Sequence, residues 1–269
     1  MILSVLIPVY NERDTILNLL AIVAAALPGV TKEIVVVDDC SRDGTRDRLR
    51  DHLMPLADQA WGAVTLGPDG LLKTEPATPE AGGTVTFKVR FHEHNRGKGG
   101  ALQTAMAEAS GDVIVIQDAD LEYDPADWAP MYDLIAIRRV ADVVYGSRFY
   151  GRPHRSLFFH HYLANKLISL LFNILYNQTL SDVEVCYKMF TRKVLETLRI
   201  TCDNFGFEIQ LSAQIARQRH LRIYETGISY YGRTYAEGKK INWKDGVKAL
   251  GYLVKFRFES LPCLSRNGR

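Results

Sequence analysis

Two carboxylates stand one residue apart in the Asp-Ala-Asp-Leu-Glu stretch at 118–122, directly after the largely apolar stretch at 112–117. A continuous apolar run of this kind is typical of a strand buried on both faces of a parallel sheet. Carboxylates at the carboxyl end of such a strand lie where open α/β sheets bind ligands. Asp118 and Asp120 are therefore candidates to bind a hard divalent cation that also contacts a diphosphate. An Asp-x-Asp pair is common by itself, so the rest of the chain has to support this interpretation.

Polar residues also follow two other strand-like runs. The first run ends in the Pro-Val-Tyr-Asn-Glu stretch at 8–12, and the second ends at Asp39. Both ends are expected at the sheet edge that carries the acidic pair. We predict that Asp39 accepts hydrogen bonds from a nucleotide base or ribose, with Tyr10 and Glu12 completing the pocket. The alternative is that Asp-Gly-Thr at 43–45 only caps the next helix, and the two roles can coexist.

Cationic residues occupy three further turns. Lys98 lies in a Gly-rich turn at 94–100 that leads into a helix, where backbone N–H groups and a lysine suit a phosphate, although the Walker spacing is missing. Arg148 follows another strand end, where it either reaches a phosphate or forms a structural ion pair. The stretch at 232–240 is expected to close over phosphates, unless it is a solvated surface loop; its cations are Arg233, Lys239 and Lys240.

Two carboxylates in the second half of the chain, Asp182 and Glu208, are candidates to orient an acceptor or to act as a general base. Each is equally well explained as a structural hydrogen-bond acceptor. The residues alone leave both interpretations open.

The elements that must position these residues alternate along the first 145 positions. This alternation predicts an α/β fold with a mostly parallel, Rossmann-like sheet flanked by helices. The stretch at 58–83 is rich in Gly, Pro and Thr and is expected to be an inserted surface loop with room for a small hairpin. We expect strands at 2–9, 33–37, 84–91, 113–117, 142–145 and 221–230, and helices at 13–27, 45–54, 99–109, 126–138, 157–178 (one helix or a pair), 207–219 and 243–258.

Composition narrows the class of protein. The chain has 269 residues, 47% of them hydrophobic and 24% charged, which fits one large α/β domain. Its four cysteines lack zinc or redox spacing and fit a reducing compartment. No apolar run approaches the roughly 18–20 residues that span a bilayer, so we expect a soluble or peripheral protein. From residue 232 onward nine Lys or Arg stand against three Asp or Glu, which suits nucleic acid, anionic lipid or substrate phosphate.

Five motifs in this order resemble the family 2 glycosyltransferases of the GT-A fold. They are Ile-Pro-Val-Tyr-Asn-Glu at 7–12, Val-Val-Asp-Asp-Cys-Ser at 36–41, Asn-Arg-Gly-Lys-Gly at 95–99, Asp-Ala-Asp-Leu-Glu-Tyr at 118–123 and Gly-Ser-Arg-Phe at 146–149. The branch that looks most similar contains dolichyl-phosphate mannose synthase and bacterial polyprenyl-phosphate sugar transferases. The resemblance covers about residues 2–241, so we expect a GT-A domain at 1–241 followed by a basic amphipathic helix and tail at 242–269.

The resemblance implies a role for each matching residue. The nucleotide sugar would be held by Pro8, Tyr10, Glu12, Asp39, Lys98, Asp118, Lys239 and Lys240. A Mg²⁺ or Mn²⁺ ion would be held by Asp118, Asp120 and Glu122, and would neutralise charge on the leaving diphosphate. The catalytic residues would be Asp120, Asp182, Arg148 and Arg233. Cys186 stands where the family more often has glycine, which puts the local acceptor geometry in doubt.

The leading hypothesis is an inverting, metal-dependent hexosyltransferase. It would move a hexose from a UDP- or GDP-sugar to a dolichyl or undecaprenyl phosphate, in the cytoplasm or peripherally on the cytoplasmic membrane face. A lipid phosphate is already anionic and needs positioning more than a base. The alternative keeps the donor but uses a soluble or glycan acceptor, with Asp182 or Glu208 as general base. We expect no nucleic-acid partner; the sugar and the nucleotide base stay open.

Overall fold

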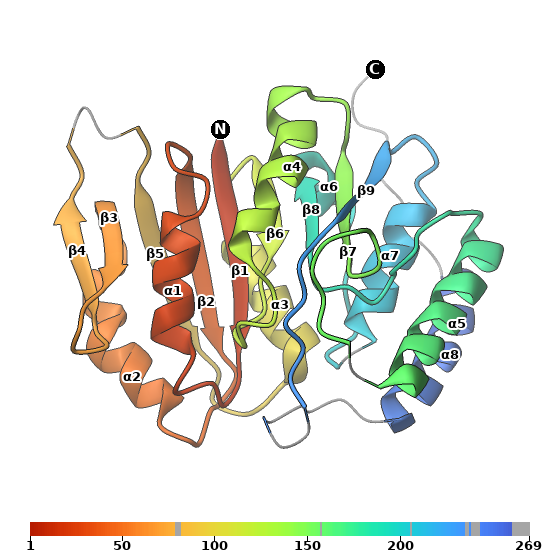
Figure 1. Cartoon of the computed structure of the whole chain (residues 1–269), viewed down its shortest axis with the longest axis horizontal. Coiled ribbons are helices and arrows are strands. Elements are labelled where there is room, and N and C mark those ends of the chain that lie inside the picture. The colour runs from red at the N-terminus through yellow and green to blue at the C-terminus, as the bar shows by residue number, and fades with distance from the viewer. Residues whose placement is uncertain (79–81, 157, 205, 235–236, 238–242, 260–269) are drawn as a thin grey trace.

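The computed structural model of the chain describes residues 1–78, 82–156, 158–204, 206–234, 237 and 243–259. Its centre is a nine-stranded sheet in the order β4-β3-β5-β2-β1-β6-β8-β7-β9, with helices on both faces (Figure 1). The four strands β5, β2, β1 and β6 are parallel neighbours, as the sequence predicts. Their bounds are Ile2–Val9 for β1, Thr31–Asp38 for β2, Val85–Phe91 for β5 and Val113–Ile116 for β6.

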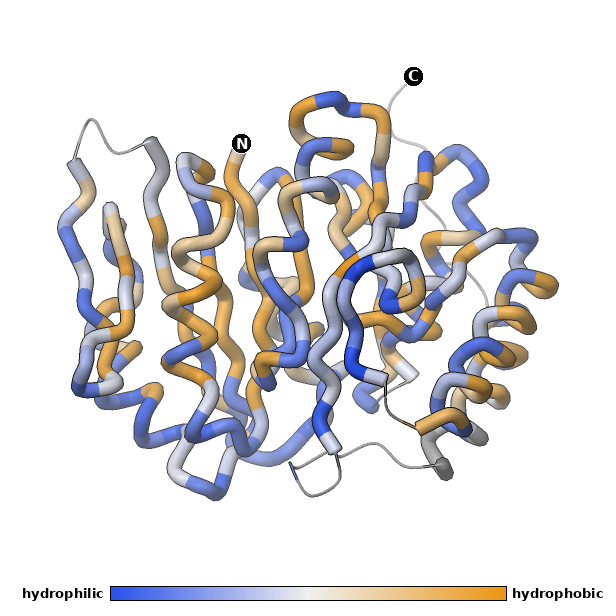
Figure 2. Tube along the Cα trace, in the orientation of Figure 1, coloured by the Kyte–Doolittle hydropathy of each residue, from blue (hydrophilic) through white to orange (hydrophobic). Residues whose placement is uncertain are grey.

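The central strands form because their side chains are apolar on both faces. Every residue of β6 is fully buried, and so are Val5, Leu6 and Ile7 of β1. A helix follows each of the first three parallel strands, which gives the βαβ connections that a parallel sheet requires. These helices are α1 at Ile16–Ala25, α2 at Thr45–His52 and α3 at Gly97–Glu108. The tube coloured by hydropathy shows the apolar sheet at the centre and polar turns at the lower edge (Figure 2).

The inserted stretch at 58–83 contains a hairpin. Strand β3 at Ala60–Leu66 pairs antiparallel with β4 at Leu72–Pro76 and extends one edge of the sheet. Gly70 in the connecting turn has a φ of 73°, a conformation that glycine adopts without steric cost. The described part of this stretch therefore contains the small hairpin for which the sequence left room, and that hairpin continues the main sheet.

The far edge of the sheet is mixed. Strand β7 at Val143–Ser147 is parallel to β9 at Ile223–Gly227, and the short antiparallel β8 at Lys188–Thr191 lies between β6 and β7. The sequence analysis did not predict β8 or the following α6 at Arg192–Thr197. Strand β8 has only four residues, and it begins with Lys188. A lysine is rarely fully buried, as this one is, so the sequence pattern did not indicate a buried strand.

Short and long helices complete the fold. The helix expected at 126–138 is divided into η2 at Pro125–Asp127, α4 at Trp128–Tyr132 and the π-helical η3 at Asp133–Ile137. The stretch at 157–178 forms one helix, α5 at Phe159–Tyr176, rather than a pair. Helix α5 packs against α8 at Trp243–Phe258, which in turn packs against α7 at Phe207–Ala216, and the three lie at one end of the molecule (Figure 1). Over the described ranges, no helix is both long and apolar enough to cross a membrane.

Candidate active site

The carboxyl ends of β1 and β6 bring two distant motifs together. Because these strands are paired in parallel register, with Leu6 opposite Ile116, the residues that follow them leave the sheet at the same edge. The hydroxyl of Thr15 joins the two turns by donating to the carbonyl of Ala119 at 2.9 Å. The expected meeting of the residue 8–12 motif and the acidic motif at this edge is therefore confirmed as a matter of placement.

Arg233 lies among the carboxylates of both motifs. Its guanidinium lies 3.0 Å from Glu12, 3.2 Å from Asp120 and 3.5 Å from Glu122. Its backbone N–H also donates to Glu122 at 2.8 Å. Burial disfavours the charged guanidinium, but the hydrogen bond to Glu12 and the charges of the neighbouring acids raise the pKa of Arg233 above its ordinary value. One arginine therefore supplies positive charge to three acidic side chains.

The acidic turn holds more negative charge than its partners neutralise. Burial, followed by the charges of Asp118 and Glu122, raises the pKa of Asp120 to about 7. Hard carboxylate oxygens with excess negative charge suit a divalent cation such as Mg²⁺ or Mn²⁺. Within the described part of the chain, no three His, Cys, Asp or Glu side chains are arranged around one point as metal ligands. Asp118 is paired with Lys98, and Asp120 and Glu122 are paired with Arg233.

Lys98 connects the acidic turn to helix α7. Its ammonium lies 2.8 Å from Asp118 and 3.1 Å from Glu208. The other oxygen of Glu208 is bound by the fully buried Lys188. Burial opposes the charge on Lys98, but Asp118 is the largest influence that raises its pKa. Lys98 thus reaches the edge where a phosphate is expected, and Glu208 is held by two lysines.

Asp39 organises the Gly-rich turn. One carboxylate oxygen accepts from His92 Nδ1 and from the N–H of Arg96, both at 2.8 Å, and the other accepts from the N–H of Gly97 at 2.7 Å. A carboxylate oxygen has room for two hydrogen bonds, so Oδ2 keeps capacity for a ligand. Gly97 has a φ of 80° and lies so near the Asp203 backbone that a Cβ would clash. The predicted contact of Asp39 with a nucleoside stays a prediction.

Arg148 and Asp182 form a buried, bidentate ion pair behind this edge. The two N–O distances are 2.6 Å and 2.7 Å, and Asp182 is fully buried. The guanidinium carbon of Arg148 also lies over the Tyr230 ring, 5.2 Å from its centre. Burial opposes its charge, but Asp182 raises the pKa of Arg148 well above its ordinary value. The geometry favours the structural ion pair over an arginine free to reach a phosphate, and it engages both oxygens of the fully buried Asp182 with the same guanidinium.

This pair gives the first prediction. Arg148→Met is expected to lower the free energy of unfolding by about 3–5 kcal/mol, because Asp182 would stay buried without its partner. Urea denaturation followed by circular dichroism measures the change. The double variant Arg148→Met, Asp182→Leu should recover most of the loss. A single variant as stable as the parent chain would mean that the pair is not structural.

Glu184 is a residue that the sequence analysis passed over in favour of Asp182. It is half-buried, and no ion pair joins it to any residue in the described ranges. Burial is the largest influence on Glu184 and outweighs the opposing charge of Arg148, so that its pKa rises to about 7. In the sequence, Glu184 is simply a second acid two positions after Asp182, and nothing in the local pattern distinguishes it. Only the burial of the 182–186 segment, which includes Cys186, sets it apart.

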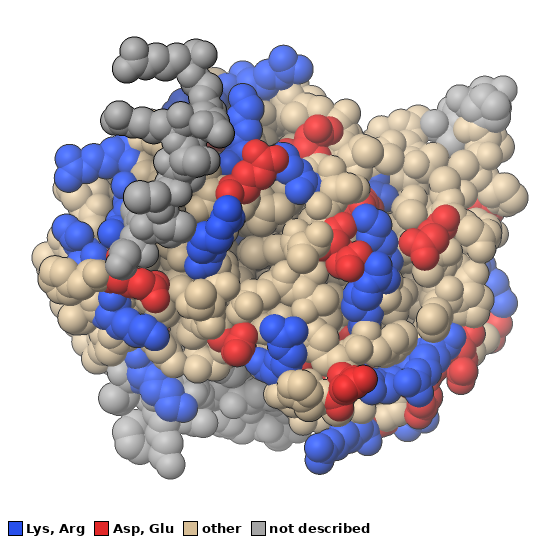
Figure 3. Space-filling model, turned by 180° about the vertical axis from the view of Figure 1, so that it is seen from behind, with Lys and Arg blue, Asp and Glu red and all other residues tan. Residues whose placement is uncertain are grey.

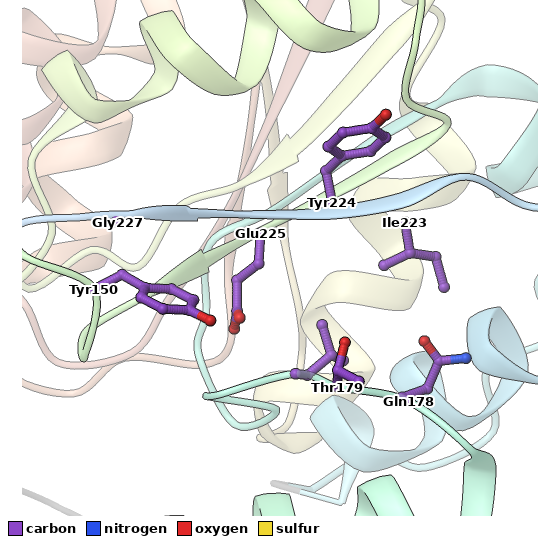
Figure 4. Close-up of a pocket in the computed structure, with 8 residues that line it drawn as sticks. Tyr150, Gln178, Thr179, Ile223, Tyr224, Glu225 and Gly227 are labelled. Carbon is purple, nitrogen blue, oxygen red and sulfur yellow. The ribbon is translucent and has the colours of Figure 1, made fainter.

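A separate hollow of about 310 Å³ lies at the β9 edge. Glu225 points from β9 toward the loop that holds Thr179, whereas Tyr224 points to the other side of the strand (Figure 4). The Glu225 carboxylate accepts from the N–H and hydroxyl of Ser181 and from the N–H of Asp182. The hollow contains none of the predicted site residues. Glu225 supports the segment that holds Asp182.

The remaining predicted residues are placed as follows. Pro8 pairs with Val37 inside the sheet, and Tyr10 is partly exposed at the end of β1. Lys239 and Lys240 lie outside the described residues, so their expected role in a closing loop stays a prediction.

Comparison with known proteins gives one family. Residues 4–58 and 80–199 match the family described as Glycosyl transferase family 2. The unmatched interval between the two segments contains the β3–β4 hairpin.

Three curated relatives are similar over different lengths. The dolichol-phosphate mannosyltransferase of Pyrococcus furiosus is 31% identical over 54% of this chain and 33% of its own length. The low-salt glycan biosynthesis hexosyltransferase Agl6 of Haloferax volcanii is 26% identical over 94% of this chain and 53% of its own length. The undecaprenyl-phosphate 4-deoxy-4-formamido-L-arabinose transferase of Serratia proteamaculans is 22% identical over 97% of this chain and 67% of its own length. The chain therefore spans between a third and two thirds of the length of these relatives.

Solved structures support the fold. Glucosyl-3-phosphoglycerate synthase from Mycobacterium tuberculosis, in complex with Mn²⁺, uridine diphosphate and phosphoglyceric acid, has a TM-score of 0.62 and 18% identity. The alignment covers 95% of this chain and 78% of that one.

Proposed function

We propose that this chain, which belongs to glycosyl transferase family 2, transfers a hexose from a nucleoside-diphosphate sugar to a polyprenyl phosphate and inverts the anomeric carbon. The observation that carries the proposal is the acidic turn with excess negative charge, flanked by Lys98 and Arg233 at the ligand-binding edge of the sheet. The names of two relatives, a dolichol-phosphate and an undecaprenyl-phosphate sugar transferase, support a lipid phosphate as acceptor.

The side chains at the edge have complementary tasks. Asp39 and Tyr10 would orient the nucleoside, since Asp39 keeps acceptor capacity and Tyr10 is partly exposed. The N–H of Asp39 donates to the carbonyl of Val9, the residue before Tyr10. Asp118, Asp120 and Glu122 would hold a divalent cation, which when bound stabilises the negative charge of a leaving diphosphate. Lys98 and Arg233 would add positive charge at the same place. Interactions that strengthen as charge develops on the leaving group lower the barrier.

The acceptor step needs no proton acceptor when the nucleophile is a phosphate. An anionic phosphate oxygen forms a bond to the anomeric carbon while the bond from that carbon to the diphosphate breaks, so nucleoside diphosphate leaves and the configuration inverts. Correct placement of the phosphate then supplies most of the acceptor-side rate gain. The buried Arg148–Asp182 pair and Tyr230 would shape that side of the site without exchanging protons.

A hydroxyl acceptor is the second candidate, and one observation favours a particular base for it. Asp182 and Glu208 are both engaged in ion pairs, whereas Glu184 is half-buried with a pKa raised by burial to about 7. A carboxylate with that pKa can accept a proton from a hydroxyl near neutral pH. For this alternative, Glu184 replaces Asp182 and Glu208 as the best candidate base.

Glu184→Gln separates the two candidates and is our second prediction. With a polyprenyl phosphate the rate should stay within about 3-fold of the parent chain, whereas loss of a needed base lowers rates about 10²–10⁴-fold. Both rates are measured in one reaction that contains labelled donor, a short polyprenyl phosphate and a soluble glycan. Loss of lipid product in Glu184→Gln would contradict the phosphate-acceptor mechanism.

The same residue predicts a pH dependence of stability. The folded state raises the pKa of Glu184 above its unfolded value, so the protonated acid is favoured and its stabilising contribution is present below the unfolded pKa. That contribution is lost as the pH rises through about 7. Glu184→Gln should therefore flatten the fall in unfolding free energy between the unfolded pKa and about 7. Urea titrations across this range measure the effect, and identical profiles for both chains would contradict it.

A further inference from the structure

Helix α5 exposes a continuous apolar stripe. Residues three or four positions apart share one side of a helix, and this stripe extends for about 22 Å along the axis. The opposite side carries the buried Phe172 and Tyr176, and the Tyr176 hydroxyl donates to the Leu253 carbonyl of α8 at 3.0 Å. The stripe, here called the α5 face, consists of Phe159, Leu163, Leu167, Leu170 and Ile174, with exposed fractions of 73%, 55%, 47%, 55% and 68%.

The surroundings of the α5 face are cationic. The sequence from 151 to 181 contains three Lys or Arg and three His but no Asp or Glu. Helix α8, which packs against the opposite side of α5, exposes Lys255 and Arg257, and the Arg257 guanidinium lies over the Tyr176 ring. Figure 3 shows Lys and Arg side chains gathered along the margin of the molecule that carries α8. An apolar face with a cationic margin is complementary to the interface of a membrane that contains anionic lipids.

Helix α5, which carries the α5 face, lies next to the side of the site where the acceptor is proposed to bind. Tyr162 of α5 packs edge-on against Phe149, with ring centres 5.3 Å apart, and Lys166 lies 4.9 Å from the centre of the same ring. Phe149 directly follows Arg148 at the end of β7. Figure 1 shows α5 at the outer end of the molecule, with no other described element over its outer side. A surface in contact with α5 would therefore lie beside the active edge of the sheet.

A second copy of the chain is a poorer occupant. A two-fold dimer through this face would place the same surface on both sides of the interface. The cationic margin of one copy would then meet that of the other, and the 151–181 segment offers no acidic residue as a partner. Like charges across an interface oppose association.

We propose that the α5 face docks this chain on the surface of an anionic lipid bilayer, with the apolar stripe inserted among the lipids and the basic margin against their headgroups. The docking itself does not depend on the proposed function. The further consequence, that docking brings a membrane-resident lipid phosphate to the Arg148 side of the site, rests on it.

Two isoleucines of equal exposure provide a matched test. Ile174 lies on the α5 face, Ile137 lies on η3 away from it, and each is 68% exposed. Sedimentation with vesicles of phosphatidylcholine containing phosphatidylglycerol should show binding of the parent chain that weakens as salt is raised. Ile174→Glu should reduce the partition coefficient about 10-fold or more, since burial of one such side chain is worth that much. Ile137→Glu should change it by less than about 2-fold.

Three results would overturn the docking proposal. They are failure of the parent chain to bind anionic vesicles, equal effects of the two substitutions, and a dimer in analytical ultracentrifugation that Ile174→Glu dissociates. Sugar transfer separates this proposal from the previous one. With a short, water-soluble prenyl phosphate Ile174→Glu should match the parent chain, and with a long-chain acceptor in vesicles it should be slower. Vesicle binding without any transfer would overturn the proposed function and leave the docking proposal intact.

Discussion

Asp120→Asn is expected to slow sugar transfer by about 10³-fold, the order of loss seen when a group that stabilises a developing charge is removed. Asp120 is the central acid of the turn, and burial together with Asp118 and Glu122 raises its pKa to about 7. The folded structure therefore disfavours the ionised form of Asp120, as expected for a carboxylate that binds a cation. Initial rates with Mn²⁺ and labelled donor measure the loss.

The same substitution should not weaken the fold. Removing one of several mutually repelling, half-buried carboxylates leaves the melting temperature unchanged or raises it, and calorimetry measures this directly. Asp133→Asn is the matched control, because Asp133 is a helix residue paired only with Arg138 in the described structure, away from the site. Equal rates for Asp120→Asn and Asp133→Asn would contradict the assignment of the acidic turn.

Arg233→Ala is expected to strengthen Mn²⁺ binding and at the same time to slow transfer. In the structure the guanidinium contacts Glu12, Asp120 and Glu122, so it supplies the positive charge that a bound cation would otherwise bring. Without it, we expect Mn²⁺ to bind about 10-fold more tightly in the absence of nucleotide, a change of about 1.4 kcal/mol. Transfer should fall about 100-fold, because a cation that would stabilise the leaving diphosphate is missing.

Electron paramagnetic resonance of free Mn²⁺ measures the binding without any need for turnover. Arg222→Ala is the control, since Arg222 also pairs with an acid, Asp142, but at the exposed end of β9. Weaker Mn²⁺ binding in Arg233→Ala would show that the arginine does not compete with the cation.

The sequence could predict the parallel half of the sheet because its strands carry clear local patterns. Strands β1, β2 and β6 contain apolar runs, and apolar residues alternate with polar ones in β5. Strands β1, β2, β5 and β6 appear close to their expected positions, and the polar residues after them meet at one edge. Four of the five motifs that carry the resemblance to family 2 lie at or just after the ends of these strands. Local patterns were sufficient to locate these strands, although β5 and β6, which follow each other along the chain, lie on opposite sides of the β2–β1 pair.

Long-range pairing explains what the sequence could not predict. The partners of Arg148 and Lys98 are separated from them by many residues, so the Asp182 pair and the bridge to Glu208 exist only once β7, α3 and α7 are packed. Arg233, whose expected role near a phosphate stays a prediction, contacts acids more than a hundred positions earlier. Burial raises the pKa of Glu184 to about 7, and burial likewise exists only once the chain is packed.

The interrupted helix near 126–138 has a local cause. Pro130 lies within α4 and has no N–H to donate, so the regular hydrogen-bond pattern cannot run through this segment. The chain continues as a π-helix, in which the N–H of Arg138 donates to the carbonyl of Asp133. Hydrophobic spacing alone did not predict this change of helix type.

Formation of a lipid-linked sugar tests the central claim most directly. Purified chain with Mn²⁺ or Mg²⁺ is given labelled UDP-glucose, UDP-N-acetylglucosamine or GDP-mannose, each with and without a short polyprenyl phosphate, and label is counted in the organic phase. We predict organic-phase label from one donor that requires both the lipid and the metal and disappears in Asp120→Asn. Nucleotide-sugar binding with no lipid product would contradict the proposed acceptor, and failure to bind any donor would contradict the assignment of the site.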